Sequence, residues 1–278
     1  MEEIVYSADS QLLAPRRFVQ AALTDLRASP MVAWSLFRRN LQAQYRQSWL
    51  GYLWLLLPPL ATTLVWVYLN TAHVLNVGKT NTPYPIYVLT GTILWQVFAE
   101  ALNCPLRQLS TARDILTKTR IPHEALVLAG VYEVVFNFAV RLVIALPICF
   151  WLKSPLSWLW LVAPLGVLAL LLLGLTIGLL LTPLGLLYQD VSRSLTLVVG
   201  FWFFLTPVIY PAPTKGIAAQ LVALNPVTPL LATTRDWLTL GGLNPAPGFA
   251  PVIAVSMLCL ILGWGVYRLA SPHLIARL

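Results

Sequence analysis

Charged residues are scarce in this 278-residue sequence. Asp, Glu, Lys and Arg together make up 10% of it, hydrophobic residues make up 58%, and the mean hydropathy is +0.76. Soluble globular chains carry about 25% charged residues, so the composition excludes an ordinary soluble domain, a disordered chain and collagen. A membrane-spanning helix needs about 20 apolar residues. The sequence therefore predicts an all-α integral membrane protein with roughly six spans, short loops and no second large soluble domain.

Groups that carry catalysis are also scarce. The three histidines are isolated, and the sequence contains neither a His-Glu-x-x-His pair nor a Gly-x-Ser-x-Gly elbow. The three cysteines fall in or beside apolar segments, which is typical of small core residues. Gly78-Lys79-Thr80 resembles the end of a phosphate-binding loop, but His73 stands where that motif needs its first glycine. We therefore expect no enzyme activity, no metal and no cofactor in this chain.

Hydrophobic runs and prolines divide the chain into segments. Residues 1–29 read as a polar lead-in, within a cytoplasmic N-terminal segment of residues 1–48. Residues 31–47 read as an amphipathic helix in the membrane interface, and the alternative is a cytosolic helix packed on protein. Pro58-Pro59 predicts a break inside the first span. The six spans of the transmembrane domain, residues 49–270, are expected at about 50–71, 85–104, 125–152, 156–181, 195–210 and 249–269, and residues 271–278 form a cytoplasmic tail.

Two connections stand out. Residues 105–124 form the longest internal polar segment. Residues 211–248 are apolar but contain six prolines, which predicts two short helices, 216–224 and 226–240, in a re-entrant hairpin. Thirteen Lys and Arg residues fall on the side of the termini and four on the other side. The positive-inside rule then places both termini and the 105–124 loop in the cytoplasm and the hairpin outside. The net charge of +8 is explained by this asymmetry and by lipid headgroups rather than by nucleic acid.

One polar set lies inside a predicted span. Glu133, Asn137 and Arg141 follow one another at four-residue intervals and share a helical face. Because charges at mid-bilayer are costly, they must face protein or water. Either they fix helix packing or they line a polar translocation path, with Glu100 and Asn103 of the second span as candidate partners.

Several segments resemble, in order, the permease subunits of ABC-type polysaccharide exporters, which serve O-antigen, capsule and teichoic-acid export. The similarity spans about residues 34–270. The matching segments are Arg38-Arg39-Asn40-Leu41, Tyr45–Trp54, Pro58-Pro59, Ile115–Pro122, Tyr188-Gln189-Asp190-Val191, Phe204–Pro211 and Leu224–Pro229. Gln189 stands where the family usually has arginine, which weakens any role assigned to a cation there.

The resemblance implies a homodimer in the bacterial inner membrane, paired with two separate ATPase subunits that bind ATP and Mg. Such permeases carry an undecaprenyl-diphosphate-linked glycan from cytoplasm to periplasm, and the loop after the second span seats on the ATPase. The residues expected to make that contact are Asp114, Ile115, Leu116 and Lys118.

The resemblance also suggests where the substrate is handled. Arg38, Arg39 and Arg46 are candidates to attract the diphosphate by charge-assisted hydrogen bonds. The aromatic candidates for a glycan channel are Trp66, Tyr68, Phe201, Trp202 and Phe204, and the alternative is ordinary packing or lipid contact. The candidates for a periplasmic gate are Leu221, Leu224, Leu230 and Leu231, and the alternative is a passive cover.

Two other functions remain open at the level of sequence. An ABC exporter of other lipids or drugs shares these motifs. A membrane-embedded transferase of envelope assembly is the alternative from a different class, against which the missing catalytic cluster argues.

Overall fold

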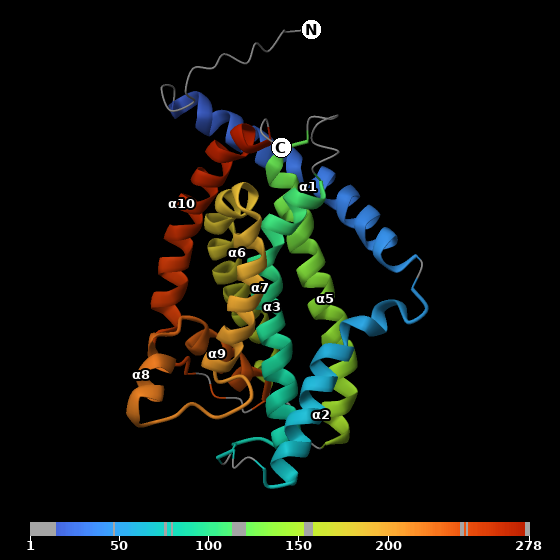
Figure 1. Cartoon of the computed structure of the whole chain (residues 1–278), viewed down its shortest axis with the longest axis vertical. Coiled ribbons are helices and arrows are strands. Elements are labelled where there is room, and N and C mark those ends of the chain that lie inside the picture. Colours follow the sequence, from blue (N-terminus) through green and yellow to red (C-terminus); the bar gives the residue numbers. More distant parts are fainter. Residues whose placement is uncertain are drawn as a thin grey trace.

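All described elements of the computed structural model are helices. It describes residues 15–46, 48–74, 77–78, 80–112, 121–152, 158–239, 242 and 244–275. The helices form one bundle (Figure 1). We call the end that carries α1 (Pro15–Tyr45) and the last residues of α10 (Phe249–Ile275) the α1 end. The other end carries α8 (Gly216–Leu224) and α9 (Val227–Thr239), and we call it the hairpin end.

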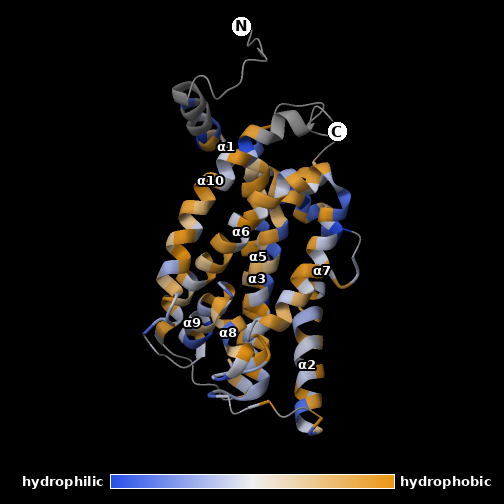
Figure 2. Ribbon diagram, turned by 60° about the vertical axis from the view of Figure 1, so that its left-hand side comes forward, coloured by the Kyte–Doolittle hydropathy of each residue, from blue (hydrophilic) through white to orange (hydrophobic). Residues whose placement is uncertain are grey.

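Among the described residues, four helices are long and apolar enough to cross a membrane. They are α3 (Tyr84–Thr111), α5 (His123–Trp151), Leu159–Leu187, which includes α6 (Ala163–Leu187), and α10 over Phe249–Leu269. Hydrophobic residues cover most of α3, α6 and α10 (Figure 2). The other two predicted spans contain α2 (Leu57–Thr71) and α7 (Gln189–Leu205), with 15 and 17 residues. The chain is therefore membrane-embedded, and the count of six spans stays a prediction.

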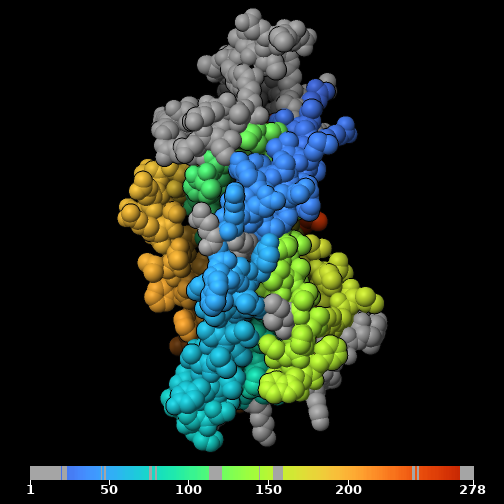
Figure 3. Space-filling view, turned by 90° about the vertical axis from the view of Figure 1, so that its right-hand side faces the viewer, coloured from blue at the N-terminus to red at the C-terminus, as the bar shows by residue number. Residues whose placement is uncertain are grey.

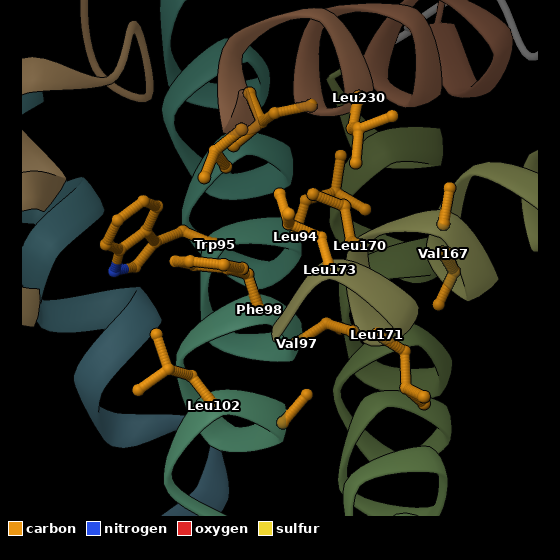
Figure 4. Close-up of a cluster of buried hydrophobic side chains, with 14 of the residues drawn as sticks. Leu94, Trp95, Val97, Phe98, Leu102, Val167, Leu170, Leu171, Leu173 and Leu230 are labelled. Carbon is orange, nitrogen blue, oxygen red and sulfur yellow. The ribbon is translucent and has the colours of Figure 1, made fainter. Parts of the chain in front are cut away.

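The core lies between α3 and α6. Leu94, Phe98 and Leu102 of α3 are buried against Leu170 and neighbouring side chains of α6, and Leu230 of α9 lies above them (Figure 4). A Cβ atom on Gly174 would lie 2.6 Å from the carbonyl oxygen of Phe98, and one on Gly178 would lie 2.3 Å from that of Leu102. Glycine at these positions allows the two backbones to approach closely, as at many helix interfaces in membranes.

The amphipathic helix is longer than the sequence suggested. Residues 15–29, expected as a polar lead-in, belong to α1, which continues through Pro30. Contacts on both sides of the proline stabilise the helix, because Asp25 pairs with Arg268 of α10 at 2.5 Å and Phe37 is buried against α5. The helix thus packs on protein, and its contact with a membrane interface stays a prediction.

The first predicted span is broken next to its paired prolines, as the sequence predicted. The 3₁₀ helix η2 (Gly51–Leu55) ends one residue before Leu56, and α2 begins at Leu57 with Pro58 and Pro59 in its first turn. Missing N–H groups are tolerated there, since the first turn has no intrahelical acceptors for them. Figure 3 shows α1, η2 and α2 following one another along one flank of the molecule.

Other boundaries shift by a few residues. Helix α3 runs past Cys104 and Pro105 to Thr111, and the polar stretch Tyr188–Arg193, expected as a loop, provides the first turns of α7. Asp190 in that first turn suits the positive end of the helix dipole. The two short helices of the hairpin are confirmed, and they meet at an angle of 86°. Whether they re-enter the membrane stays a prediction.

Candidate functional site

A basic cavity of about 690 Å³ lies on the flank of the bundle, between the C-terminal half of α1 and the start of η2 (Figure 1). Its lining includes Arg39 and Gln42 of α1, Arg46 in the turn directly after α1, and Gly51 and Tyr52 of η2. Gly51 has a φ of +50°, a backbone conformation that L side chains rarely adopt, and it allows the chain to turn from one helix into the other. The cavity therefore presents two guanidinium groups above the start of the first predicted span.

The structure separates the three arginines that the sequence grouped. Residues seven apart lie about 20° apart around a helix, so Arg39 and Arg46 share a face. Arg38 points about 100° away from Arg39, and it is not among the residues that line the cavity. All three side chains are exposed to solvent. Two of the three predicted headgroup residues are thus brought together.

A hydrogen-bonded chain leads from this cavity into the bundle. Arg39 Nη2 donates to Asn40 Oδ1 at 3.3 Å, and Asn40 Nδ2 donates to Gln108 Oε1 of α3 at 3.3 Å. Gln108 Nε2 donates to Glu133 Oε2 of α5 at 3.0 Å, and Arg107 Nη2 lies 3.0 Å from the same oxygen. The buried carboxylate of Glu133 is therefore compensated by α3 and connected to α1.

A second polar group lies further along the same two helices. Glu100 of α3 accepts a hydrogen bond from Asn137 Nδ2 at 3.0 Å and forms an ion pair with Arg141. Arg141 Nε also donates to the carbonyl oxygen of Leu55 in η2 at 3.2 Å. Glu100 is thus confirmed as a partner of the predicted polar set. Asn103 is not, because its amide bonds to the carbonyl oxygen of Ala99.

The polar set fixes helix packing rather than facing an open path. Glu133, Asn137 and Arg141 are only 4–8% exposed, and the bonds found for them within the described residues run to α3 and η2. Gly130 permits the close contact, because a Cβ there would lie 2.3 Å from Cys104 Sγ. Asn137 Oδ1 and Arg141 Nη1 remain unpaired with any described residue. The sequence missed Asn40, Arg107 and Gln108, of which the last two fall in the segment expected as a loop.

The aromatic channel candidates differ in their surroundings. Tyr68, Phe201 and Phe204 are more than half exposed, on α2 and α7. Trp66 is partly buried, 6.5 Å from Phe204 between ring centroids. Trp202 packs edge-on against Phe98 at 5.2 Å, and its Nε1 donates to Asn225 Oδ1 at 3.0 Å. Trp202 therefore attaches α7 to the core and to the hairpin, while the exposed three are free to meet lipid, a partner or a glycan.

Asn225 and Arg235 are two of the side chains that tie the hairpin to the bundle. Asn225 Nδ2 donates to Thr206 Oγ1 at 2.8 Å, and its Oδ1 also accepts from the backbone of Val227 at 3.0 Å. Arg235, 4% exposed, donates to the carbonyl oxygens of Pro207 and Val208 at 2.9–3.2 Å and lies 3.8 Å from the ring centroid of Tyr87. The sequence treated Arg235 only as a topological charge, and its polar neighbours Thr233, Thr234 and Asp236 gave no signal of a structural role.

The four gate candidates do not act as one group. Leu221 and Leu224 are 51% and 82% exposed. Leu230 and Leu231 are fully buried in the core of the protomer, so their placement at a seal between protomers was wrong. The ATPase-contact candidates Asp114, Ile115, Leu116 and Lys118 lie outside the described residues.

The profile of the ABC-2 type transporter family matches residues 31–238, which includes the cavity, the polar chain and the hairpin. The chain belongs to the ABC-2 transporter family. The prediction of a permease-type membrane protein of an ABC transporter is thus confirmed.

Relatives of this ABC-2 protein carry names that concern polysaccharides. The O-antigen export system permease protein RfbA of Myxococcus xanthus is 29% identical over 83% of this chain and 87% of its own. The protein of the same name from Klebsiella pneumoniae is 25% identical over 74% of this chain and 79% of its own. The polysialic acid transport protein KpsM of Escherichia coli is 20% identical over 84% of this chain and 91% of its own.

Proposed function

We propose that this ABC-2 protein is the transmembrane subunit of an ATP-driven exporter of an O-antigen-like polysaccharide. The names of its relatives support polysaccharide as the cargo, and the O-antigen permeases share more identity with it than the polysialic acid transporter does. The polymer is moved from cytoplasm to periplasm while linked to undecaprenyl diphosphate. The α1 end, with both termini, faces the cytoplasm of a bacterial inner membrane, in agreement with the positive-inside rule.

The cavity lined by Arg39 and Arg46 carries this proposal. A diphosphate is a compact, doubly anionic group, and guanidinium forks bind phosphate oxygens with two donors each. Each hydrogen bond that involves a charged group contributes about 1.5–3 kcal/mol. The exposed apolar side chains nearby on η2, Leu53 and Trp54, suit the lipid tail. A lipid-linked diphosphate therefore matches both the charge and the surroundings of this cavity.

Energy must come from another subunit. The sequence carries no phosphate-binding loop, and ABC transporters are defined by an ATPase that binds ATP and Mg. We propose two such ATPase subunits that contact the 105–124 segment of each of two permease copies. The exposed Tyr68, Phe201 and Phe204 lie on α2 and α7 and would face the glycan in a channel between the copies.

Deletion and complementation test the proposal. We expect that removing the gene from its natural host abolishes one surface polysaccharide, that the lipid-linked polymer accumulates inside, and that the intact chain restores export. An affinity-tagged chain should co-purify with an ATPase. Loss of a polymer anchored on lipid A indicates O-antigen, and loss of a capsular polymer indicates the capsule alternative. Unchanged surface polysaccharides would contradict the proposal.

A further inference from the structure

A second polar cavity, of about 270 Å³, lies at the hairpin end of the molecule. It is bounded by the start of α3, the segment that follows α7, and α9. Its polar lining includes Thr82, Tyr87, Arg235 and Asp236, and the exposed Asn81 is at its rim. A water molecule occupies about 30 Å³ of liquid. The cavity is therefore much larger than a site for one water or one ion.

Three polar groups in the lining of this cavity have no partner among the residues that the structure describes. Arg235 Nε and Thr82 Oγ1 are buried and make no hydrogen bond to any described residue. Thr82 and Arg235 are 6% and 4% exposed. No bond or ion pair to the carboxylate of Asp236 is found among residues 80–112 and 158–239, which contain the whole lining. Asp236 is partly exposed, so water or a polar ligand reaches it. Each buried polar group without a partner costs about 1–3 kcal/mol, which a polar ligand that bonds to it would offset.

The guanidinium of Arg235 is a fixed wall of the cavity rather than a free cation. Its two terminal nitrogens already donate to the carbonyl oxygens of Pro207 and Val208, and its plane lies over the ring of Tyr87. A Cβ atom on Gly91 would lie 2.2 Å from Nη2, so α3 also confines the group. These bonds use three of its five N–H groups, and the N–H on Nε is one that has no acceptor among the described residues.

The charges around the cavity select the chemistry of that ligand. The Asp236 carboxylate and the carbonyl oxygens around Arg235 disfavour an anion, and the buried guanidinium disfavours a free cation. What remains is a neutral molecule that both donates and accepts hydrogen bonds. Pro207 and Pro211 add apolar wall to the polar groups. A sugar ring combines hydroxyl groups at its edge with apolar C–H faces and suits this lining.

We infer that this cavity is an outer subsite that binds one neutral sugar unit of the exported polymer as the polymer passes the hairpin. Asp236 accepts a sugar hydroxyl, Arg235 Nε donates to a ring or hydroxyl oxygen, and Thr82 completes the contact. The inference rests on the proposed polysaccharide cargo. It adds a second place, at the hairpin end and apart from the basic cavity, where the glycan itself is recognised.

Cysteine protection in the complete transporter tests the subsite. Ala212→Cys places a thiol on the exposed lining of the cavity, and Ala218→Cys places one on the exposed face of α8, away from it. The probe is a mixture of oligosaccharides made by partial acid hydrolysis of the surface polysaccharide that disappears on gene deletion. We expect millimolar probe to slow labelling of Cys at position 212 by a hydrophilic maleimide at least threefold, without slowing labelling at position 218. Adding Asp236→Asn to Ala212→Cys should abolish the protection.

Export by substituted chains separates this inference from the proposed function. Asn81→Ala should lower surface polysaccharide at equal amounts of folded protein, whereas Asn70→Ala, an amide on α2 that does not line the cavity, should not. If the intact chain exports polysaccharide but the probe gives no protection at position 212, the proposed subsite is wrong, whereas the proposed export function is unaffected. If the intact chain exports no polysaccharide, the proposed function fails and the subsite fails with it.

Discussion

Helix α3 contacts α6 through glycines and apolar side chains, whereas another of its faces contacts α5 through buried charges. On the α6 side, Gly174 and Gly178 bring the two backbones together without polar side chains between them. On the α5 side, Glu100, Gln108 and Arg107 compensate a polar set and connect it to α1 and η2. The first interface depends on close packing and the second on charge pairing, so they should respond differently to substitution.

The largest effect is expected from removing a charge on the α5 side. Arg141→Met leaves Glu100 without its buried partner, and breaking a buried ion pair costs about 3–5 kcal/mol. The amount of monodisperse protein that survives heating in detergent should fall sharply. The double variant Arg141→Met with Glu100→Met removes both charges and should recover much of the loss. A double variant as unstable as the single one would show that packing, not charge, dominates this interface.

A somewhat smaller effect is expected on the α6 side. The added methyl group of Gly178→Ala meets the backbone of α3 at Leu102, and overpacking of this kind costs about 1–3 kcal/mol. Gly200→Ala is the matched control, because nothing lies within 4 Å of a Cβ atom there. Thermal unfolding of the two variants in the same detergent compares them. Equal midpoints would contradict the close approach of α3 and α6.

The smallest effect is expected from the exposed member of the charge set. The side chain of Arg107 is 47% exposed, and exposed ion pairs contribute about 0–1 kcal/mol. Arg107→Ala should therefore shift thermal stability little, because Gln108 still donates to Glu133. A loss as large as that of Arg141→Met would mean that Glu133 depends on Arg107 and that the amide alone does not compensate it.

Sequence patterns located the helices better than the partners of their side chains. Four-residue spacing placed Glu133, Asn137 and Arg141 on one face, and Glu100 was a correct partner because its polarity stood out in an apolar span. Gln108 was missed because Pro105 suggested a helix end, although α3 continues through it. A proline predicts a missing hydrogen bond, but only tertiary packing decides whether the helix ends.

The need for tertiary packing also limits what the sequence predicts about the hairpin. The prolines and the Leu-Asn-Pro junction predicted two short helices, and both form. The face that each leucine presents depends on how α9 lies on α3 and α6, which one sequence does not show. Leu230 and Leu231 were therefore assigned to a surface that they do not reach.

The basic cavity offers the most direct measurement of the central claim, that Arg39 and Arg46 receive a lipid diphosphate. The complete transporter would be reconstituted in vesicles with and without undecaprenyl diphosphate, and its ATP hydrolysis measured. We expect the lipid to stimulate the intact protein and Arg38→Ala, whose side chain lies outside the cavity, but to stimulate Arg46→Ala at least fivefold less. Equal stimulation of Arg46→Ala and Arg38→Ala would contradict the claim.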